Sequence, residues 1–516
     1  MRVLWLTAAF PDIRGTGGMV HELELLRATA EKNEITLITT FWMISPEALR
    51  TVEELGVRVV VVTWAWQDAY VRRSKLYKLV RLLGGAAPNF EVWSRRKRLK
   101  PLAEVIRREQ RGRPFDVAFV IQGEMAEILD VVEAPTTLLL YDIYSRLTSL
   151  VRNKRSVRAI RYRIEGRNAG PWERAWYKHA DAIACVSEID AAVASEMIGR
   201  EVETIPNPVP DDFFVPPTVP RSDTSVTLIG SFGWEPNFDS VLWVCSEIWP
   251  RVSEARPDAR LRVVGRFGSP ELRRTVEAAG GEFFGDVDDI RPYYWDAAVI
   301  VASIRMGSGM RNKVLHAMAC GAPLVATPSA LEGIDPRATD HMLVAEDTAG
   351  LVEAIIETLN DPQAARARAQ GATAIAASYS SASAGAALER WWRTVARPGS
   401  VSPQSDRPAV AMPSVSVVVS TRARPDLLKM TLATIAEAAA LVPGTEIIVV
   451  EQGERSAEAI CSDLGLEATV ISDDGFGVSR ARNKGMRAAR NDAVLFTDDD
   501  CEVPLGWVRA HASALS

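Results

Sequence analysis

The chain has 516 residues, 47% hydrophobic and 24% charged, which fits a soluble globular protein of about two to four domains. The formal net charge of −6 argues against general nucleic-acid binding, and no apolar run approaches the roughly 18 residues of a membrane span. The amino terminus reads as a strand rather than a signal peptide, and five scattered cysteines without a CxxC pair fit a reducing compartment, so we expect a cytoplasmic protein.

The first 205 residues alternate helical stretches with short runs of almost continuous Val, Ile and Leu. Such runs are typical of a parallel sheet covered by helices on both faces. The predicted strands are residues 3–7, 34–41, 57–63, 116–121, 136–141 and 182–186. The proline-rich segment 205–220 then predicts a hinge or linker.

The alternation restarts after this hinge. The predicted strands are residues 226–229, 261–264, 282–284, 297–302, 323–326 and 341–344, and helices follow to Val395. We therefore expect two tandem Rossmann-like doubly wound α/β domains, residues 1–205 and 206–397, with a ligand cleft between them. The last helix, about residues 380–397, is expected to pack back on the first domain.

A Pro- and Ser-rich flexible linker is expected at residues 398–414, before a third α/β module at 415–516. Its predicted strands are residues 415–420, 446–451, 468–472 and 493–496, and its predicted helices are residues 425–440 and 478–490. The last of these strands runs into three consecutive aspartates, residues 498–500.

The segment GSGMRNKVLHAMACG (307–321) lies between two predicted strands of the second domain. A strand, a glycine-bearing turn and a helix form the unit that binds phosphates in open α/β sheets. Gly307 and Gly309 are expected to take positive φ, and the helix that begins near Arg311 directs its free N–H groups at an anion. Because Arg311 and Lys313 add cations where a structural helix prefers acidic residues, the segment predicts a diphosphate site; a surface turn with two solvated basic residues is the alternative.

Residues 146–178 are rich in Arg and Lys. A solvated helical face explains such a run, and a patch for an anionic membrane surface or a phosphate-bearing acceptor is the alternative.

Residues 1–395 resemble GT-B glycosyltransferases, close to family 4. The matching motifs are GTGGMVHELELL (15–26), ADAIACVSEIDAAV (180–193), IPNPVPDDFF (205–214), IGSFGWEPNFDSVLW (229–243), LRVVGRFG (261–268), FFGDVDDIRPYY (283–294) and MGSGMRNKVLHAMACGAPLVATPSALEGI (306–334). The resemblance implies sugar transfer from a nucleotide diphosphate sugar, with retention and without a metal. The implied donor-binding residues are Gly17, Gly18, Gly307, Gly309, Met310, Arg311, Lys313, His316 and Glu332.

The chain departs from family 4 where that family commonly has two glutamates eight positions apart. These positions are Ser308 and His316 here. A histidine can hydrogen-bond a ribose hydroxyl but supplies no fixed negative charge. This departure allows three interpretations. The donor choice is altered, the domain binds a ligand without catalysis, or the histidine is buried and structural.

Candidate groups on the acceptor side are Asp142, Glu124 and His21. Asp142 and Glu124 follow predicted strands, at the sheet edge where functional side chains gather, and His21 lies in the first helix. A structural role is the alternative for each.

Residues 415–516 resemble the beginning of a GT-A glycosyltransferase of family 2, so the third module is an incomplete GT-A-like one. The matching motifs are SVVVSTRARPDLLKMTLATI (416–435), EIIVVEQG (446–453), GVSRARNKGMRAAR (477–490) and AVLFTDDDCEVPLGW (493–507). The resemblance implies donor contacts from Glu451 and Arg482, and Mg²⁺ or Mn²⁺ held by Asp498 and Asp500. Because the acceptor half of such a module would follow, we expect a fragment of a bifunctional enzyme or a remnant that binds a donor without turnover.

The sequence thus predicts a glycosyltransferase acting on a glycan or lipid-linked acceptor in surface polysaccharide synthesis. A catalytically silent nucleotide-sugar-binding or scaffold protein is the alternative. A nucleotide-sugar epimerase would share the tandem sheets but would not need Arg311 and Lys313.

Overall fold

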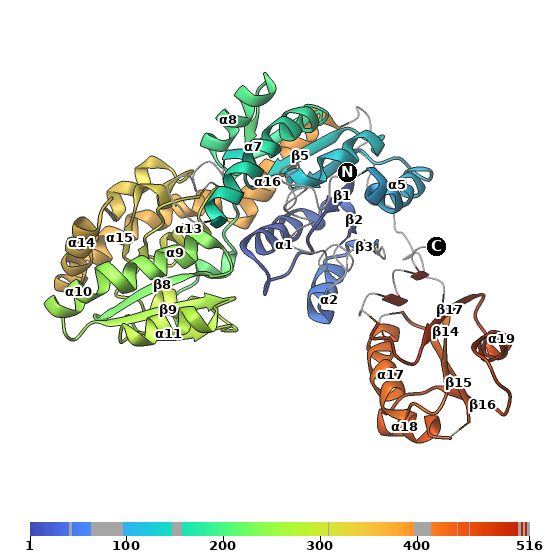
Figure 1. The fold of residues 1–516 in the computed structure, drawn as a ribbon. Helices are drawn as coiled ribbons and strands as arrows, with labels where there is room; N and C mark the ends of the chain where they lie inside the picture. The colour runs from blue at the N-terminus through green and yellow to red at the C-terminus, as the bar shows by residue number, and fades with distance from the viewer. Residues whose placement is uncertain are drawn as a thin grey trace.

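The computed structural model describes residues 1–40, 44–62, 96–146, 157–307, 309–396, 414–440, 442–453, 455–503, 507–508 and 511–512. Ser308, almost all of the expected linker and residues 147–156 of the basic segment lie outside the described residues. The described residues form three parallel sheets, each flanked by helices (Figure 1). None of the described helices is both long and apolar enough to span a lipid bilayer.

The first sheet has seven strands in the order β3-β2-β1-β4-β5-β6-β7. Its strands are β1 (Arg2–Thr7), β2 (Glu34–Thr39), β3 (Arg58–Val61), β4 (Val117–Ile121), β5 (Thr136–Leu140), β6 (Ala182–Cys185) and β7 (Glu203–Thr204). Its helices are α1 (Gly17–Ala30), α2 (Pro46–Glu54), α5 (Arg96–Gln110), η1 (Gly123–Val131), α7 (Val157–Tyr177) and α8 (Glu188–Ile198). Every predicted strand is present; β7 was missed because its two exposed residues carry no apolar run.

The second sheet has six strands in the order β10-β9-β8-β11-β12-β13. Its strands are β8 (Ser225–Ser231), β9 (Arg260–Arg266), β10 (Glu282–Gly285), β11 (Val299–Ala302), β12 (Leu324–Ala326) and β13 (Leu343–Val344). Its helices include α9 (Glu235–Trp243), α10 (Trp249–Ala255), α11 (Pro270–Ala278), α12 (Arg291–Trp295), α13 (Asn312–Ala319), α14 (Thr348–Asn360) and α15 (Pro362–Ala376). In both sheets the strand order reverses beside the first strand, which is the topology of doubly wound folds.

Side chains of a strand alternate between the two faces of its sheet. Val3 and Trp5 of β1 belong to one hydrophobic cluster, and Leu4 and Leu6 belong to another. The cluster around Trp5 continues into the second sheet, where it includes Ile300 of β11. The two sheets therefore share part of their buried core.

Helix α16 (Ser381–Val395) follows the second sheet in sequence but packs on the first. Ser381 Oγ donates a 2.7 Å hydrogen bond to Glu24 Oε2 of α1. The ring of Trp392 lies 5.3 Å from that of Phe119 in β4 and 6.1 Å from that of Trp5. These contacts agree with the helix returning to the first domain, while the exact domain boundaries stay predictions.

The third sheet has the order β16-β15-β14-β17. Its strands are β14 (Val415–Thr421), β15 (Glu446–Gln452), β16 (Thr469–Asp473) and β17 (Ala493–Asp498), and its helices are α17 (Pro425–Ala439), α18 (Ala457–Asp463) and α19 (Val478–Ala488). Figure 1 shows this module with α17 and α18 on one face of its sheet and α19 on the other.

Replacing Trp392 by Ala should destabilise the first sheet and its returning helix. Trp392 is fully buried, so the change empties a large volume between α16 and the sheet. Substitutions of this kind cost about 3–5 kcal/mol of unfolding free energy. Urea unfolding followed by circular dichroism should show a lower midpoint for this part of the chain. Arg393→Ala, at an exposed neighbouring position, is the matched control, and equal midpoints for the two variants would contradict the expectation.

Candidate active site

The segment 307–311 links β11 to α13 at the carboxyl edge of the second sheet. Gly307 has φ +118° and Gly309 has φ +78°, so both take the positive φ that the sequence predicts. Helix α13 begins at Asn312, one residue after Arg311. A Cβ on Gly307 would lie 3.1 Å from Trp234, so the loop and the indole are in close contact.

Of the two predicted cations of this segment, Arg311 is buried and Lys313 is half-buried. The Arg311 guanidinium lies 5.0 Å from the Trp234 ring, and its Nη1 donates a 2.9 Å hydrogen bond to the Gly309 carbonyl. Burial lowers the pKa of Arg311, and the carboxylates of Asp142, Glu332 and Asp190 oppose this shift. The structure therefore places Arg311 among charged groups from both sheets.

Lys313 is the second residue of α13. Its Nζ donates a 2.7 Å hydrogen bond to Asn237 Oδ1 of α9. Burial, with the nearby Arg311 charge, lowers the pKa of Lys313 to about 7. A Cβ at Gly230, near the end of β8, would lie 3.2 Å from Nζ, so this glycine leaves the room that the ammonium occupies. An anion bound here would favour the protonated lysine.

Charged side chains from the first sheet meet the loop. The N–H of Gly309 donates a 3.1 Å hydrogen bond to Oδ2 of Asp190, a fully buried residue of α8. Arg146 bridges the two halves, with 2.7 Å from Nη1 to Asp190 Oδ1 and 3.0 Å from Nη2 to Glu332 Oε2. The structure thus brings Glu332 to the loop through Arg146.

The hinge segment contributes Asn207. Its Nδ2 donates a 2.6 Å hydrogen bond to Oδ1 of Asn312, the first residue of α13, and a 3.5 Å one to the Met310 carbonyl. A Cβ on Gly17, the first residue of α1, would lie 3.4 Å from Nδ2 of Asn312. Gly17 and Met310 therefore lie at the same junction between the two halves.

His21 is buried in α1 near this junction. Burial lowers its pKa to about 3, partly offset by the side chain of Asn207, so the imidazole is neutral at physiological pH and a weak proton acceptor. Its ring lies 4.7 Å from that of Tyr141, whose hydroxyl donates to the Gly18 carbonyl at 3.2 Å. A Cβ on Gly18 would lie 2.9 Å from the Tyr141 ring, so glycine is needed for this contact.

The two remaining acceptor-side candidates lie in different surroundings. A Cβ on Gly309 would lie 2.9 Å from Oδ1 of Asp142, which places Asp142 directly against the loop. Burial, and repulsion from Glu173 of α7, raise the pKa of Glu124. Of these two carboxylates, Asp142 is the one that the structure brings to the predicted diphosphate loop.

His316 lies on α13 between aromatic rings. Its ring stacks on Phe213 at 4.1 Å and meets the edge of Tyr294 at 5.9 Å. Burial lowers the pKa of His316 to about 3. This packing fits the structural reading of the histidine, and a ribose contact stays a prediction.

In the third module the predicted residues gather at the carboxyl edge of its sheet. Arg482 Nη2 lies 2.8 Å from Asp498 Oδ1, and Arg424 Nη1 lies 3.5 Å from both Asp499 and Asp500. Asp499 is buried and accepts from the Thr421 hydroxyl at 2.7 Å, whereas Asp498 and Asp500 are half-exposed.

This donor set fits Mg²⁺ or Mn²⁺ in one specific way. Among the described residues no three His, Cys, Asp or Glu side chains converge on a metal site. Mg²⁺ is commonly held by one or two carboxylates together with substrate phosphates. Asp498 and Asp500 suit that arrangement, in which the donor completes the coordination.

Glu451 has a structural partner that the sequence did not reveal. Its Oε1 accepts hydrogen bonds from the Ser456 N–H at 2.7 Å, the Ser456 hydroxyl at 3.0 Å and the Ala457 N–H at 2.9 Å. The Glu451 carboxylate therefore caps α18, a helix that the sequence analysis does not predict. A contact between Glu451 and the donor nucleotide stays a prediction.

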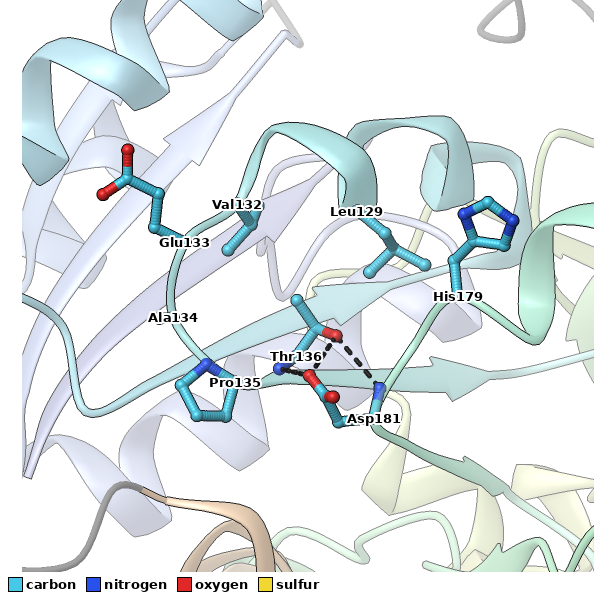
Figure 2. Close-up of a pocket in the computed structure, with 8 residues that line it drawn as sticks. All are labelled: Leu129, Val132, Glu133, Ala134, Pro135, Thr136, His179 and Asp181. Atoms are coloured by element: carbon cyan, nitrogen blue, oxygen red, sulfur yellow. Dashed lines mark hydrogen bonds between the residues drawn. The ribbon is translucent and has the colours of Figure 1, made fainter.

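A pocket of about 300 Å³ lies elsewhere, at the amino end of β5 (Figure 2). Figure 2 shows Asp181 bonded to Thr136, with Oδ2 accepting from the Thr136 N–H at 2.7 Å and its hydroxyl at 2.9 Å. Because the predicted site residues follow the carboxyl ends of the strands, this pocket is separate from the candidate site.

Sequence reasoning missed Asp190, Arg146 and Asn207. Ser187 caps α8 through the Asp190 N–H at 3.1 Å, and this local motif gives no sign of a contact with another segment. Arg146 begins the basic segment 146–178 and Asn207 lies in the proline-rich hinge, so neither is marked as a site residue by its sequence surroundings. Asp190, Arg146 and Asn207 stand out as candidate site residues only through their contacts with segments distant in sequence.

Two family models match the chain: Glycosyl transferases group 1 over residues 223–361, and Glycosyl transferase family 2 over residues 416–516. No curated protein is a significant match by sequence. These two matches confirm both resemblances.

Solved structures align with about three quarters of the chain. HepE of Anabaena, in complex with UDP and glucose, is 14% identical with a TM-score of 0.53, over 76% of this chain and 100% of HepE. Sucrose-phosphate synthase from Thermosynechococcus elongatus is 15% identical with a TM-score of 0.56, over 76% and 99%. WaaG, a glycosyltransferase involved in lipopolysaccharide biosynthesis, is 15% identical with a TM-score of 0.51, over 77% and 99%.

Because these solved structures are only 14–15% identical to the chain, their similarity shows the GT-B fold alone. The two family models are what indicate sugar transfer. The chain is therefore a glycosyltransferase in which a region of group 1, within a GT-B fold, is followed by a region of family 2.

Proposed function

We propose that the GT-B part transfers a sugar from a nucleotide diphosphate sugar, with the diphosphate held at the 307–313 segment. The observation that carries this proposal is the pair of cations at the start of α13, the buried Arg311 and the half-buried Lys313, beside positive-φ glycines. A diphosphate leaving group develops negative charge, and fixed cations and backbone N–H groups stabilise it without a metal. Retention of anomeric configuration is part of the same proposal.

The similar structures support a donor class and an acceptor class for this proposal. HepE is solved with UDP and with UDP-glucose, which supports a UDP-sugar donor. WaaG acts in lipopolysaccharide biosynthesis, which supports a glycan or lipid-linked acceptor and a role in surface polysaccharide assembly. We propose that the protein works in the cytoplasm, and that the basic segment 146–178 contacts the inner membrane surface.

The second candidate function is nucleotide-sugar binding without transfer. It is favoured by His316, which stacks on Phe213 as a neutral ring where family 4 commonly has a glutamate. For the third module we propose donor binding assisted by Mg²⁺ or Mn²⁺, with Arg482 beside the metal carboxylates.

Incubation with a panel of nucleotide sugars and acceptor extracts should release a nucleoside diphosphate. Arg311→Ala should weaken donor binding about ten- to hundred-fold, because it removes hydrogen bonds to a charged group. Arg337→Ala, at an exposed arginine of the same half, is the control. Donor binding without release would favour the silent protein, and unchanged affinity in Arg311→Ala would refute the diphosphate assignment.

Donor affinity should fall as pH rises above about 7. Lys313 has a pKa of about 7 in the donor-free protein, and a neighbouring diphosphate stabilises its charged form. Binding above pH 7 therefore takes up a proton, and the affinity drops by up to about ten-fold per pH unit. Calorimetry with UDP-glucose in buffers of different ionisation enthalpy measures this uptake.

Lys313→Arg is the control for this pH effect, because an arginine stays charged throughout the range. The variant should bind with little pH dependence. Proton release on binding, or an equal slope in both proteins, would contradict the placement of Lys313 beside the diphosphate.

Mn²⁺ binding in the presence of UDP should depend on Asp498 and Asp500. The double change Asp498→Asn/Asp500→Asn removes both carboxylates, and the UDP-dependent uptake of Mn²⁺, followed by electron paramagnetic resonance of the free ion, should disappear. Asp492→Asn, at an exposed position before β17, is the control. Equal uptake in the double variant would exclude these two residues as the metal ligands.

A further inference from the structure

The 307–311 loop already holds an anion, which comes from the protein itself. Asp190 Oδ2 accepts from the Gly309 N–H at 3.1 Å and from the Ser187 hydroxyl at 2.6 Å. Asp190 Oδ1 accepts from Arg146 Nη1 at 2.7 Å. Three donors therefore converge on one fully buried carboxylate.

These donors belong to both halves of the GT-B part. Gly309 lies on the second half, while Ser187 and Arg146 lie on the first. Arg146 also reaches Glu332 of the second half at 3.0 Å. The Asp190 carboxylate of the first half thus lies where Arg146 meets the 307–311 loop of the second half.

A backbone N–H of this kind serves one strong acceptor at a time. Carboxylate and phosphate oxygens both only accept hydrogen bonds, so they compete for the Gly309 N–H. They also repel each other when both lie in a site from which water is excluded. A diphosphate at the loop and the Asp190 carboxylate on Gly309 are therefore alternatives.

We propose that Asp190 is an internal competitor of the donor diphosphate, which takes the place of its carboxylate on the Gly309 N–H and beside Arg146. This inference rests on the proposed diphosphate site at the 307–313 segment. In the donor-free protein the contact keeps the loop and Arg146 in position and joins the two halves. Donor binding releases Asp190 and makes Arg146 available to the phosphates.

Asp190→Asn is the direct test. It removes the charge and keeps the shape, and Ser187 still caps α8 through the residue 190 N–H. We expect UDP, GDP, ADP or dTDP, whichever binds the wild-type protein, to bind the variant about five-fold more tightly or better, the size of a modest coupling between sites. The matching nucleoside, which lacks phosphates, should bind both proteins equally.

Glu188→Gln is the matched control. Glu188 lies in the same first turn of α8 but is exposed, so its replacement removes an equal charge away from the loop. Its diphosphate affinity should equal that of the wild type. An equal gain in both variants would reduce the effect to net charge and overturn the proposal.

Ser187→Ala is a second variant, independent of the first. It removes the hydroxyl that orients the Asp190 carboxylate and caps α8. Its diphosphate affinity should also rise, and it decides the question if Asp190→Asn does not fold. Unchanged or weaker diphosphate binding in the folded variants would overturn the proposal and make Asp190 an organiser of the loop.

The two proposals fail in different ways. If the wild-type protein binds none of the four diphosphates, the donor site itself is wrong, and this inference falls with it. If the wild-type protein binds one of them and the variants show no gain, only the role of Asp190 is wrong.

Discussion

The hydrogen bond from the Gly309 N–H to the Asp190 carboxylate joins the two halves of the GT-B part at the predicted catalytic junction. It is possible only because residue 309 lacks a side chain: a Cβ would lie 2.9 Å from both Asp142 Oδ1 and the Tyr141 carbonyl. Glycine at position 309 meets two requirements: it adopts positive φ, and it leaves room for Asp142 and Tyr141. Arg146, Glu332 and Arg311 lie around the same point.

The charges at this junction are arranged differently from those of a protein surface. Arg311 is buried against Trp234, Lys313 is hydrogen-bonded to a neutral amide, and Asp190 is enclosed by three donors. Buried charges are costly unless they are paired, so each must be compensated by a neighbour or by a ligand. A junction that holds cations beside carboxylates can exchange one ion pairing for another when an anionic ligand binds, as we propose for the donor.

The third module follows the same physical principle with different groups. Asp498 and Asp500 lie at the carboxyl end of β17 and are half-exposed beside Arg482 and Arg424, whereas Asp499 is turned inward onto Thr421. In the GT-B part we propose that protein cations meet the diphosphate, and in the third module a divalent ion held by carboxylates. On these proposals, one chain contains two diphosphate sites, one lined by protein cations and the other by carboxylates that hold a metal ion.

The sequence by itself determined the three parallel sheets, the positive φ of Gly307 and Gly309, and the two glycosyltransferase families, because these depend on local patterns of apolar residues, glycines and short motifs. Only the tertiary structure decided that Asp190, Arg146 and Asn207 meet the loop, that His316 stacks on Phe213, and that Glu451 caps α18. Each of the contacts at the loop joins segments more than a hundred residues apart, and a helix cap or a basic run reads the same in sequence whether or not it faces another half. Local pattern fixes which element a residue belongs to, whereas the packing of one half on the other fixes what its side chain touches.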